Sequence, residues 1–487
     1  MVRKRNSPVE MEGAEFKQAG YQLIDQIADF IDNISRKPVT SGISPAEISE
    51  IIGRQSLPEY GCAANDIVTR AADLLFNYSL FNGHPRFQGY ITSSAAPIGA
   101  LADLLAAAVN PNVGAYILSP VATEIERQAV KWLATLIGLP SSFEGILVSG
   151  GNMANFTAFF AAIQAKMPAS KKEGVRGSVS KPLVFCCRTT HTWIEKAAAL
   201  SGLGTDSIRW IPADRANRMD ISLLEQTIQK EKKDGGLPLM VIGTAGDVST
   251  GAVDDLKSIA AICKANDCWF HIDGAYGLPA AVVPELHDLF EGMADADSVA
   301  LDPHKWLYAP LEAGCTLVKD PNHLIQAYSS HPVYYNFSNE DEPEARNFYE
   351  YGFQNSRGFR ALKVWMLLQQ AGRRGYAEMI SMDIELAGLL FRLASQHPEL
   401  EALTHHLSIT TLRYCPPGYP EDGLNRLNEL LLNDLQRGGE VFMSNAIVDK
   451  KYCLRACIVN FRTSEADIED IIEIIVRSGR RLVEKTL

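Results

Sequence analysis

Lys305 is the residue whose surroundings most clearly point to chemistry. It follows the apolar run 298–301 and is followed at once by Trp306, Leu307 and Tyr308. Apolar surroundings disfavour the protonated form of a lysine amine, and the free amine attacks carbonyl carbons. We therefore interpret Lys305 as a lysine that forms a Schiff base. The alternative is a lysine that lays its stem along apolar surface and keeps its ammonium in water.

A glycine turn upstream is suited to a phosphate group. The run 145–149 (GILVS) predicts a buried strand, which leads into Gly150, Gly151 and Asn152 and then into a predicted helix at 153–165. Where a helix begins after such a turn, free backbone N–H groups and the helix dipole both favour an anion. The motif is weak when taken alone.

Two further side chains follow predicted strands. Asp273 comes after the run 268–272, and His191 follows the strand 183–187 at the start of a helix. The carboxyl ends of parallel strands open onto the crevice where α/β sheets bind ligands, although a lone aspartate is as often a cap or turn former. Pyridoxal phosphate (PLP) requires these groups in this order along the chain: a phosphate-binding turn, a histidine, an aspartate and a lysine. The aspartate keeps the pyridine nitrogen protonated, so that the ring accepts the electrons released at Cα.

On its motifs the chain resembles the group II PLP-dependent amino acid decarboxylases, which include the aromatic-L-amino-acid, histidine and glutamate decarboxylases. The resemblance runs from about residue 20 to near the C-terminus. Its most specific stretches are GHPRFQGY, LSPVATEIERQAVKWL, VSGGNMAN, HTWIEKA, TAGDVSTGAVDD, HIDGAYG, DPHKW, SRGFRALKVW and LRACIVNFRT. It implies a PLP-dependent carboxy-lyase that decarboxylates an L-amino acid to the amine and CO2.

The resemblance also implies roles at matching positions. Lys305 would be the Schiff-base lysine, Asp273 the partner of the pyridinium nitrogen, and His191 the imidazole stacked on the cofactor ring. These three residues would form the catalytic centre together with a tyrosine on a separate loop.

That tyrosine is implied by the resemblance as the group that returns a proton to Cα after CO2 leaves. The segment 331–347 offers Tyr334 at the matching place, with Tyr335 beside it. Its part at 336–347 is acidic and poor in apolar groups, so we expect the loop to be a lid rather than a rigid element. The resemblance implies that aldehyde synthases carry another residue there, so Tyr334 favours simple decarboxylation.

Further cofactor contacts follow from the same resemblance. Gly151 and Asn152 would lie on the phosphate-binding turn with His304 beside it, and Ala275 would pack under the ring. Asp247 stands where many relatives have a threonine near the ring oxygen, and its role is left open.

The substrate is the least determined part of this interpretation. Tyr90 and Tyr116 match the region that lines the side-chain pocket of aromatic decarboxylases, and Gly114 is expected to leave space there. An L-aromatic amino acid is therefore the first choice. An acidic substrate, glutamate or aspartate, held by Arg86 is the alternative.

Other functions were weighed against the same residues. A nicotinamide-dependent dehydrogenase is disfavoured because VSGGNMAN lacks the GxGxxG spacing. An aminotransferase of the same fold would need an arginine for the substrate carboxylate, and Arg360 and Arg462 keep that possibility open. A protein that binds without turnover is disfavoured by the intact Lys305 and Asp273.

Composition limits the class of partner. The chain has 487 residues, and 46 basic against 58 acidic residues give a net charge of −12, which argues against nucleic acid or an anionic membrane. The longest apolar stretch, 95–109, is interrupted by Asp103 and is too short to span a bilayer. Nine cysteines show no metal-type spacing and suggest reduced thiols. We expect a cytoplasmic protein without a metal, whose partner is a small amino acid.

The elements that must position these residues alternate along the chain. Strands are predicted near 145, 183, 207, 238, 268, 297 and 314, with helices between most of them. This pattern is typical of a mainly parallel seven-stranded sheet covered on both faces. We expect an α/β protein of the PLP-dependent transferase fold type I.

Two folded domains are expected. The large PLP-binding domain spans 81–375, and a helix at 359–370 leads to a small C-terminal α+β domain at 376–487. The small domain is predicted to end with a strand at 455–461 and a helix at 465–482.

An N-terminal helical segment at 1–80 precedes them. Its predicted helix at 15–34 carries an apolar stripe with no partner nearby in sequence. The resemblance implies that the segment wraps around a second subunit, in a homodimer whose active sites are shared. The turn 356–359 and Tyr116 are candidates for reaching across.

Overall fold

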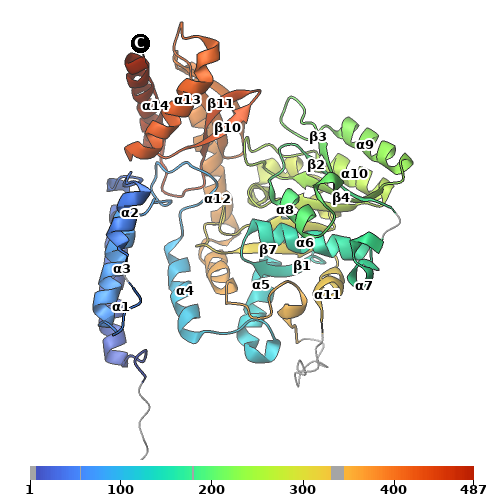
Figure 1. Ribbon diagram of the computed structural model, residues 1–487, viewed down its shortest axis with the longest axis horizontal. Helices are drawn as coiled ribbons and strands as arrows, with labels where there is room; N and C mark the ends of the chain where they lie inside the picture. Colours follow the sequence, from blue (N-terminus) through green and yellow to red (C-terminus); the bar gives the residue numbers. More distant parts are fainter. Residues whose placement is uncertain (1–6, 55, 178–179, 331–344, 487) are drawn as a thin grey trace, which may run out of the picture.

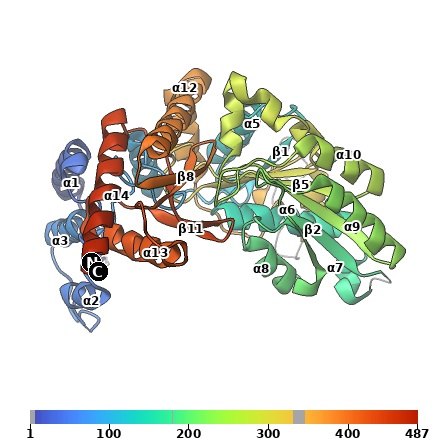
Figure 2. The ribbon, with the colours of Figure 1, turned by 90° about the horizontal axis from the view of Figure 1, so that it is seen from above.

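The computed structural model describes residues 7–54, 56–177, 180–330 and 345–486. A helical arm, a large α/β part and a small α+β part follow one another along the chain (Figure 1). Seen from above, the arm and the small part lie at one end of the molecule and the large sheet at the other (Figure 2).

The large part is built on a seven-stranded sheet, as predicted. Neighbouring strands follow the order β1-β7-β6-β5-β4-β2-β3, and all are parallel except β7, which runs antiparallel to β1 and β6. Most strand residues are buried, because helices cover both faces. The strands are β1 (Glu144–Val148), β2 (Pro182–Cys187), β3 (Ile208–Ile211), β4 (Leu237–Thr244), β5 (Trp269–Asp273), β6 (Ser298–Leu301) and β7 (Gly314–Val318).

Helices form a layer on each side of this sheet. Each layer encloses its own apolar cluster against the strands. One layer contains α5 (Pro120–Leu136), α9 (Ile221–Lys233), α10 (Leu256–Asn266) and the start of α12 (Ala361–Gln396). The other contains α6 (Gly151–Lys166), α8 (Trp193–Leu200) and α11 (Asn322–Tyr328), with the short α7 (Ser170–Glu173) beside α6.

The small part is an antiparallel sheet of order β10-β11-β9-β8 packed against helices. Its elements are β8 (Leu400–His406), β9 (Ile409–Tyr414), α13 (Glu421–Gly438), β10 (Ser444–Val448), β11 (Lys451–Cys457) and α14 (Glu465–Thr486). The second half of α12 completes its core.

The strand predicted at 455–461 was wrong in its bounds, because β11 ends at Cys457 and the side chain of Asn460 accepts the N–H of Arg462 to form a turn. The long helix α12 runs across residue 375, with non-helical angles at Gly372 (φ 62°, ψ 173°). The domain boundaries at 80 and 375 therefore stay predictions.

The arm consists of α1 (Gly13–Asn33), α2 (Pro45–Ile52) and α3 (Ala64–Tyr78), and α4 (Pro97–Val109) follows it against α12. Helix α1 packs mainly on α3, with Phe30 stacked on Phe76 at 4.8 Å between ring centroids. Of the apolar stripe predicted at 15–34, only Ile34 is buried, and Ala19, which lies outside the stripe, is buried as well. Much of the apolar surface of the arm is thus left uncovered by this chain.

Two composition-based expectations can be compared with the structure. Within the described ranges, no helix has both the length and the apolar character needed to cross a bilayer. All nine cysteines lie in those ranges and each is a free thiol, most of them buried.

Candidate active site

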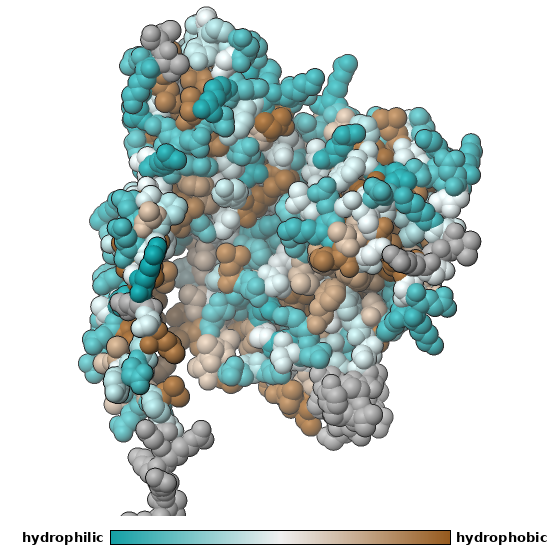
Figure 3. Space-filling model, viewed as in Figure 1, coloured by the Kyte–Doolittle hydropathy of each residue, from teal (hydrophilic) through white to brown (hydrophobic). Residues whose placement is uncertain are grey.

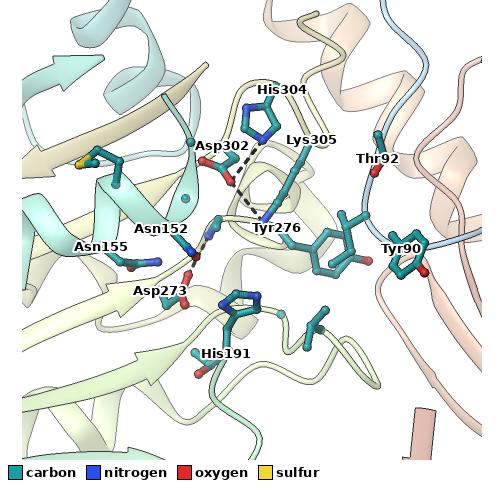
Figure 4. Close-up of a pocket in the computed structure, with 18 of the residues that line it drawn as sticks. Tyr90, Thr92, Asn152, Asn155, His191, Asp273, Tyr276, Asp302, His304 and Lys305 are labelled. Atoms are coloured by element: carbon teal, nitrogen blue, oxygen red, sulfur yellow. Dashed lines mark hydrogen bonds and ion pairs between the residues drawn. The ribbon is translucent and has the colours of Figure 1, made fainter. Parts of the chain in front are cut away.

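The residues predicted to do chemistry meet at one edge of the large sheet. The carboxyl ends of β1, β2, β4, β5 and β6 surround a cavity of about 500 Å³ (Figure 4). Asp273 is the last residue of β5, Lys305 lies in the turn after β6, and His191 lies between β2 and α8. This volume falls in the range of pockets that hold cofactors and small ligands, roughly 300–1,000 Å³.

The turn between β1 and α6 is shaped for close approach of a ligand to backbone. A Cβ on Gly151 would lie 2.5 Å from the Oδ2 atom of Asp302 and 3.2 Å from the Cβ of Ala275. A Cβ on Gly150 would lie 3.0 Å from the ring of His304. Side chains at either position would fill the space in front of the first N–H groups of α6, which have no partner within the helix.

His304 forms the wall of this turn. Its Nδ1 accepts the N–H of Ala313 at 3.0 Å, which fixes the plane of the ring. Burial lowers the pKa of His304, an effect that Asp302 partly opposes. A neutral ring whose Nδ1 accepts this bond carries its proton on Nε2 and can donate it.

Lys305 is half-buried, with 23% of its side chain exposed, and its amine faces the cavity. The Nζ atom lies 3.2 Å from Oδ2 of Asp302, and Figure 4 shows Lys305 and His304 both directed at this carboxylate. Asp302 is 1% exposed, and its Oδ1 atom has no hydrogen-bond partner in the described part of the chain. A buried oxygen left without a partner at a cavity wall is ready to accept a bond from a ligand.

Asp302 was missed by the sequence analysis. Within the motif DPHKW, only the lysine and the histidine were given roles. The aspartate three residues before the lysine could have been noticed, because that spacing brings its carboxylate close to the amine.

Asp273 is buried and held by two donors. Its Oδ2 accepts the indole N–H of Trp193 at 2.7 Å, and its Oδ1 accepts the backbone N–H of Ala275 at 3.3 Å. The carboxylate still lines the cavity. Ala275 is buried beside it and also lines the cavity, as a small residue under a flat ring would.

His191 lies across the cavity from Lys305 (Figure 4). Its ring is exposed toward the cavity, and its Nδ1 accepts the backbone N–H of Trp193 at 3.3 Å. Partial desolvation lowers the pKa of His191, while Asp273 acts in the opposite direction. The imidazole is therefore neutral near pH 7, which suits stacking on a protonated ring.

The other end of the cavity is lined by larger side chains. Tyr90 is 56% exposed and adopts a left-handed backbone conformation (φ 51°). Tyr276, Thr92 and Val248 stand near it on the same cavity. The hydroxyl of Tyr276 is engaged with Ser408 at 2.7 Å, so its ring rather than its hydroxyl is available there.

Arg455 is the cation at this end of the cavity. It is 4% exposed and donates to the carbonyl of Val248, and its Nε atom has no partner among the residues that the structure describes. Burial lowers the pKa of Arg455. The sequence analysis missed it, although a charge inside the apolar strand LRACIV is the same kind of signal that singled out Lys305.

Several predicted residues lie elsewhere. Tyr116 lines a separate cavity beside α5, so this chain does not bring it to the site. Arg86 pairs with Asp470 at 3.1 Å, and Arg360 pairs with Glu312 at 3.0 Å. Arg462 lies over the ring of Phe461, with 4.5 Å from its Cζ to the ring centroid, and faces the groove beside α1 and α3. None of these arginines reaches the candidate site.

Gly114 and Asp247 both make close contacts within this chain. The prediction that Gly114 leaves space for a bulky ring was wrong, because a Cβ on Gly114 would lie 2.2 Å from the carbonyl oxygen of Asn355. Asp247 turns into its own loop, where it accepts backbone N–H groups of Ser249 and Thr250 at 2.8 and 3.1 Å. Tyr334 and Tyr335 lie outside the described residues.

The arrangement fits PLP. The glycine turn leaves a cradle that a Cβ would fill, Asp302 offers an unpartnered oxygen, and Lys305 presents an amine to the same cavity. Asp273 supplies a carboxylate on a cavity wall, where a ring nitrogen would require it. These groups can hold an aldehyde, a phosphate and a protonated ring at once.

Comparison with known proteins agrees with this chemistry. The family model "Pyridoxal-dependent decarboxylase conserved domain" matches residues 53–412. An aromatic-L-amino-acid decarboxylase from Bacillus atrophaeus is 31% identical over 471 residues, which cover 96% of each chain. A phenylacetaldehyde synthase from Petunia hybrida is 28% identical over 92% of this chain and 91% of its own. The crystal structure of an Oryza sativa TDC with PLP and tryptamine shares the fold, with a TM-score of 0.91 at 24% identity over 98% of this chain and 100% of that one.

Proposed function

The chain belongs to the pyridoxal-dependent decarboxylase family and is a PLP-dependent carboxy-lyase acting on an amino acid, and we propose that its substrates are L-aromatic amino acids. The products would be the corresponding amine and CO2. The proposal is carried by the far end of the cavity, where the exposed ring of Tyr90 and the ring of Tyr276 offer aromatic surface. The name of the Bacillus atrophaeus relative points the same way.

Residues of this chain would hold the cofactor at both ends. Gly151 and Asn152 would give backbone N–H groups to its phosphate, with His304 beside them, and Lys305 would form the covalent link. PLP supplies an electron sink for the pair left when the bond between Cα and the carboxylate breaks. Asp273 would keep the ring nitrogen protonated, and His191 would hold the ring from its other face.

We assign the return of a proton to Cα to Tyr334. The assignment comes from the sequence motif, since Tyr334 lies outside the described residues. A tyrosine hydroxyl in a closed, water-poor site can act as a general acid. With Tyr334 in this role, the expected product is the amine and not the aldehyde that the name of the Petunia hybrida relative implies.

Arg455 favours a second candidate, an acidic amino acid. Its guanidinium is buried at the cavity wall, and in the described part of the chain it has no carboxylate partner. Such a group could bind the side-chain carboxylate of glutamate or aspartate. Arg455, rather than Arg86, is thus the residue that could bind the side chain of an acidic substrate.

A substrate panel separates the two candidates. We expect purified protein with PLP to release CO2 from phenylalanine, tyrosine or tryptophan, and much less from glutamate and aspartate. If glutamate or aspartate is the preferred substrate, Arg455→Met should raise KM on it by about 10-fold to 100-fold, because a charged hydrogen bond contributes about 1.5–3 kcal/mol. Release from glutamate or aspartate alone would refute the aromatic assignment and support the acidic one.

We also propose that the protein is a homodimer. Large apolar side chains stand exposed on three helices, and Figure 3 shows apolar surface along the arm and on the body that faces it. They are Phe16, Tyr21 and Ile24 on α1, Ile67 and Leu75 on α3, and Leu101, Leu104, Leu105 and Val109 on α4. Apolar surface of this extent on one chain is typical of a face that another subunit covers.

The dimer can be tested by its mass and by its dependence on the exposed apolar face of α4. Sedimentation of the full chain should give about twice the chain mass of 53.5 kDa. Replacing Leu101 and Leu105 by glutamate should shift the protein toward monomer, because charges would be buried at the interface. Exchange of exposed Leu223 on α9 for glutamate is the control and should leave the mass unchanged. A wild-type protein that sediments as an active monomer would contradict the proposal.

A further inference from the structure

Trp193 connects the two residues expected on either side of the cofactor ring. It is the first residue of α8, it is 0% exposed, and its indole N–H donates to Oδ2 of Asp273 at 2.7 Å. Its backbone N–H donates to Nδ1 of His191 at 3.3 Å. One residue thus contacts both the carboxylate at the end of β5 and the imidazole in the loop after β2.

The indole itself is held in place by rigid neighbours. Its ring meets His271 edge to face, at 5.9 Å and 84°, and meets Phe159 at 6.2 Å and 79°. His271 is fixed in turn by Ser298 at 2.8 Å and by Asn155 at 2.7 Å. Burial lowers the pKa of His271 to about 4, so this ring is neutral near pH 7, and a hydrogen bond at each of its two nitrogens fixes its position. The direction of the indole N–H is therefore set by packing.

We propose that Trp193 is a positioning residue, which fixes the orientation of Asp273 toward the cofactor ring nitrogen and the plane of His191. This inference rests on the proposed roles of Asp273 and His191. Neither the sequence motifs nor the comparisons assign a role to this tryptophan.

The physical reason lies in the geometry of the carboxylate. Among the described residues, the carboxylate of Asp273 accepts one other hydrogen bond, the long one of 3.3 Å from the N–H of Ala275, so without the indole its plane could rotate. Hydrogen bonds to an ionised carboxylate are short and directional, and a donor on one oxygen favours the charged form. Held in one orientation, the carboxylate of Asp273 would be available to keep the cofactor's ring nitrogen protonated.

The variant Trp193→Phe tests the proposal, because it keeps an aromatic ring and removes the N–H donor. We expect kcat to fall by about 10-fold to 100-fold, as is typical when a group that orients a functional ligand is lost, with KM little changed. With ¹⁵N-labelled PLP, the ring-nitrogen resonance of the variant should move toward the unprotonated position. Should this variant fail to fold, Trp193→Met carries the same expectations.

Phe159→Leu is the matched packing control. It loosens the same aromatic cluster without contacting Asp273, and it should lower the melting temperature while the ¹⁵N resonance stays at its wild-type position. In an Asp273→Asn background, Trp193→Phe should have little further effect on kcat, because the two residues act through one contact.

The outcomes separate the inference from the function on which it rests. Wild-type kcat and an unchanged ¹⁵N resonance in Trp193→Phe, with an active wild-type enzyme, would overturn the role of Trp193 alone. The same would follow if Trp193→Phe and Asp273→Asn were fully additive. A wild-type protein that neither binds PLP nor releases CO2 would instead refute the proposed function.

Discussion

Replacing Lys305 by alanine is expected to lower kcat on the order of 10³-fold or more, since the covalent link to the cofactor is lost. The wild-type protein with PLP should be yellow, and borohydride should bleach it by reducing the link to Lys305. The Lys305→Ala protein should lack the yellow colour that the covalent link gives, and borohydride should therefore cause no bleaching. Absorption spectra and CO2 release on the same samples measure both effects.

Two control variants distinguish the effect of losing the covalent link from the effects of losing a positive charge or a buried lysine. Lys305→Arg keeps a cation beside Asp302, where the amine now lies at 3.2 Å, yet a guanidinium does not condense with an aldehyde, so this variant should also be inactive. Lys363→Met removes another buried lysine, which pairs with Asp103 at 3.1 Å and does not line the cavity, and it should stay yellow. A yellow, bleachable and active Lys305→Arg protein would contradict the role of Lys305.

The second large effect is expected for Asp273→Asn, which should lower kcat by about 10²–10³-fold. The amide keeps the shape of the carboxylate and can still accept the indole N–H of Trp193, but it carries no charge. The ring nitrogen would then lose its proton more easily, and the cofactor would be a weaker electron sink. Steady-state kinetics and the ¹⁵N resonance of the bound cofactor measure the change.

Asp297→Asn is the matched control for this variant. Asp297 accepts the N–H of Phe270 at 2.7 Å near the amino end of β5, the strand that Asp273 ends. The same chemical change at the opposite end of the strand should affect stability more than kcat. Equal kcat values for wild type and Asp273→Asn would show that the ring nitrogen does not depend on this carboxylate.

The fold could be predicted from the sequence to a large extent, because its signals are local. Most of the seven strands are short, largely apolar runs bounded by turn residues, and helical segments separate most of them. The end of β11 was misplaced for a local reason too, since the run 458–459 stays apolar although Asn460 already forms a turn. An apolar pattern indicates which residues are buried, but it does not indicate where the hydrogen bonds between two strands end.

Only those site residues that belong to a recognisable sequence motif were predicted. Lys305, Asp273, His191 and the turn at Gly151 line one cavity, as their places at strand ends suggested. The contacts of these residues could not be predicted, because they join distant positions. Trp193 meets Asp273 across 80 residues of sequence, and Arg455 meets Val248 across 207. Tyr116 lines another cavity of this chain, and because it was predicted to reach across to a partner subunit's site, its role stays a prediction.

The most direct test of the account is to locate the cofactor on the chain. The protein should be expressed with its cofactor, reduced with borohydride, digested and analysed by mass spectrometry. We predict a pyridoxyl group on the peptide that contains DPHKW, attached to Lys305. A pyridoxyl group on another lysine, or none in a protein that still decarboxylates, would contradict the central claim.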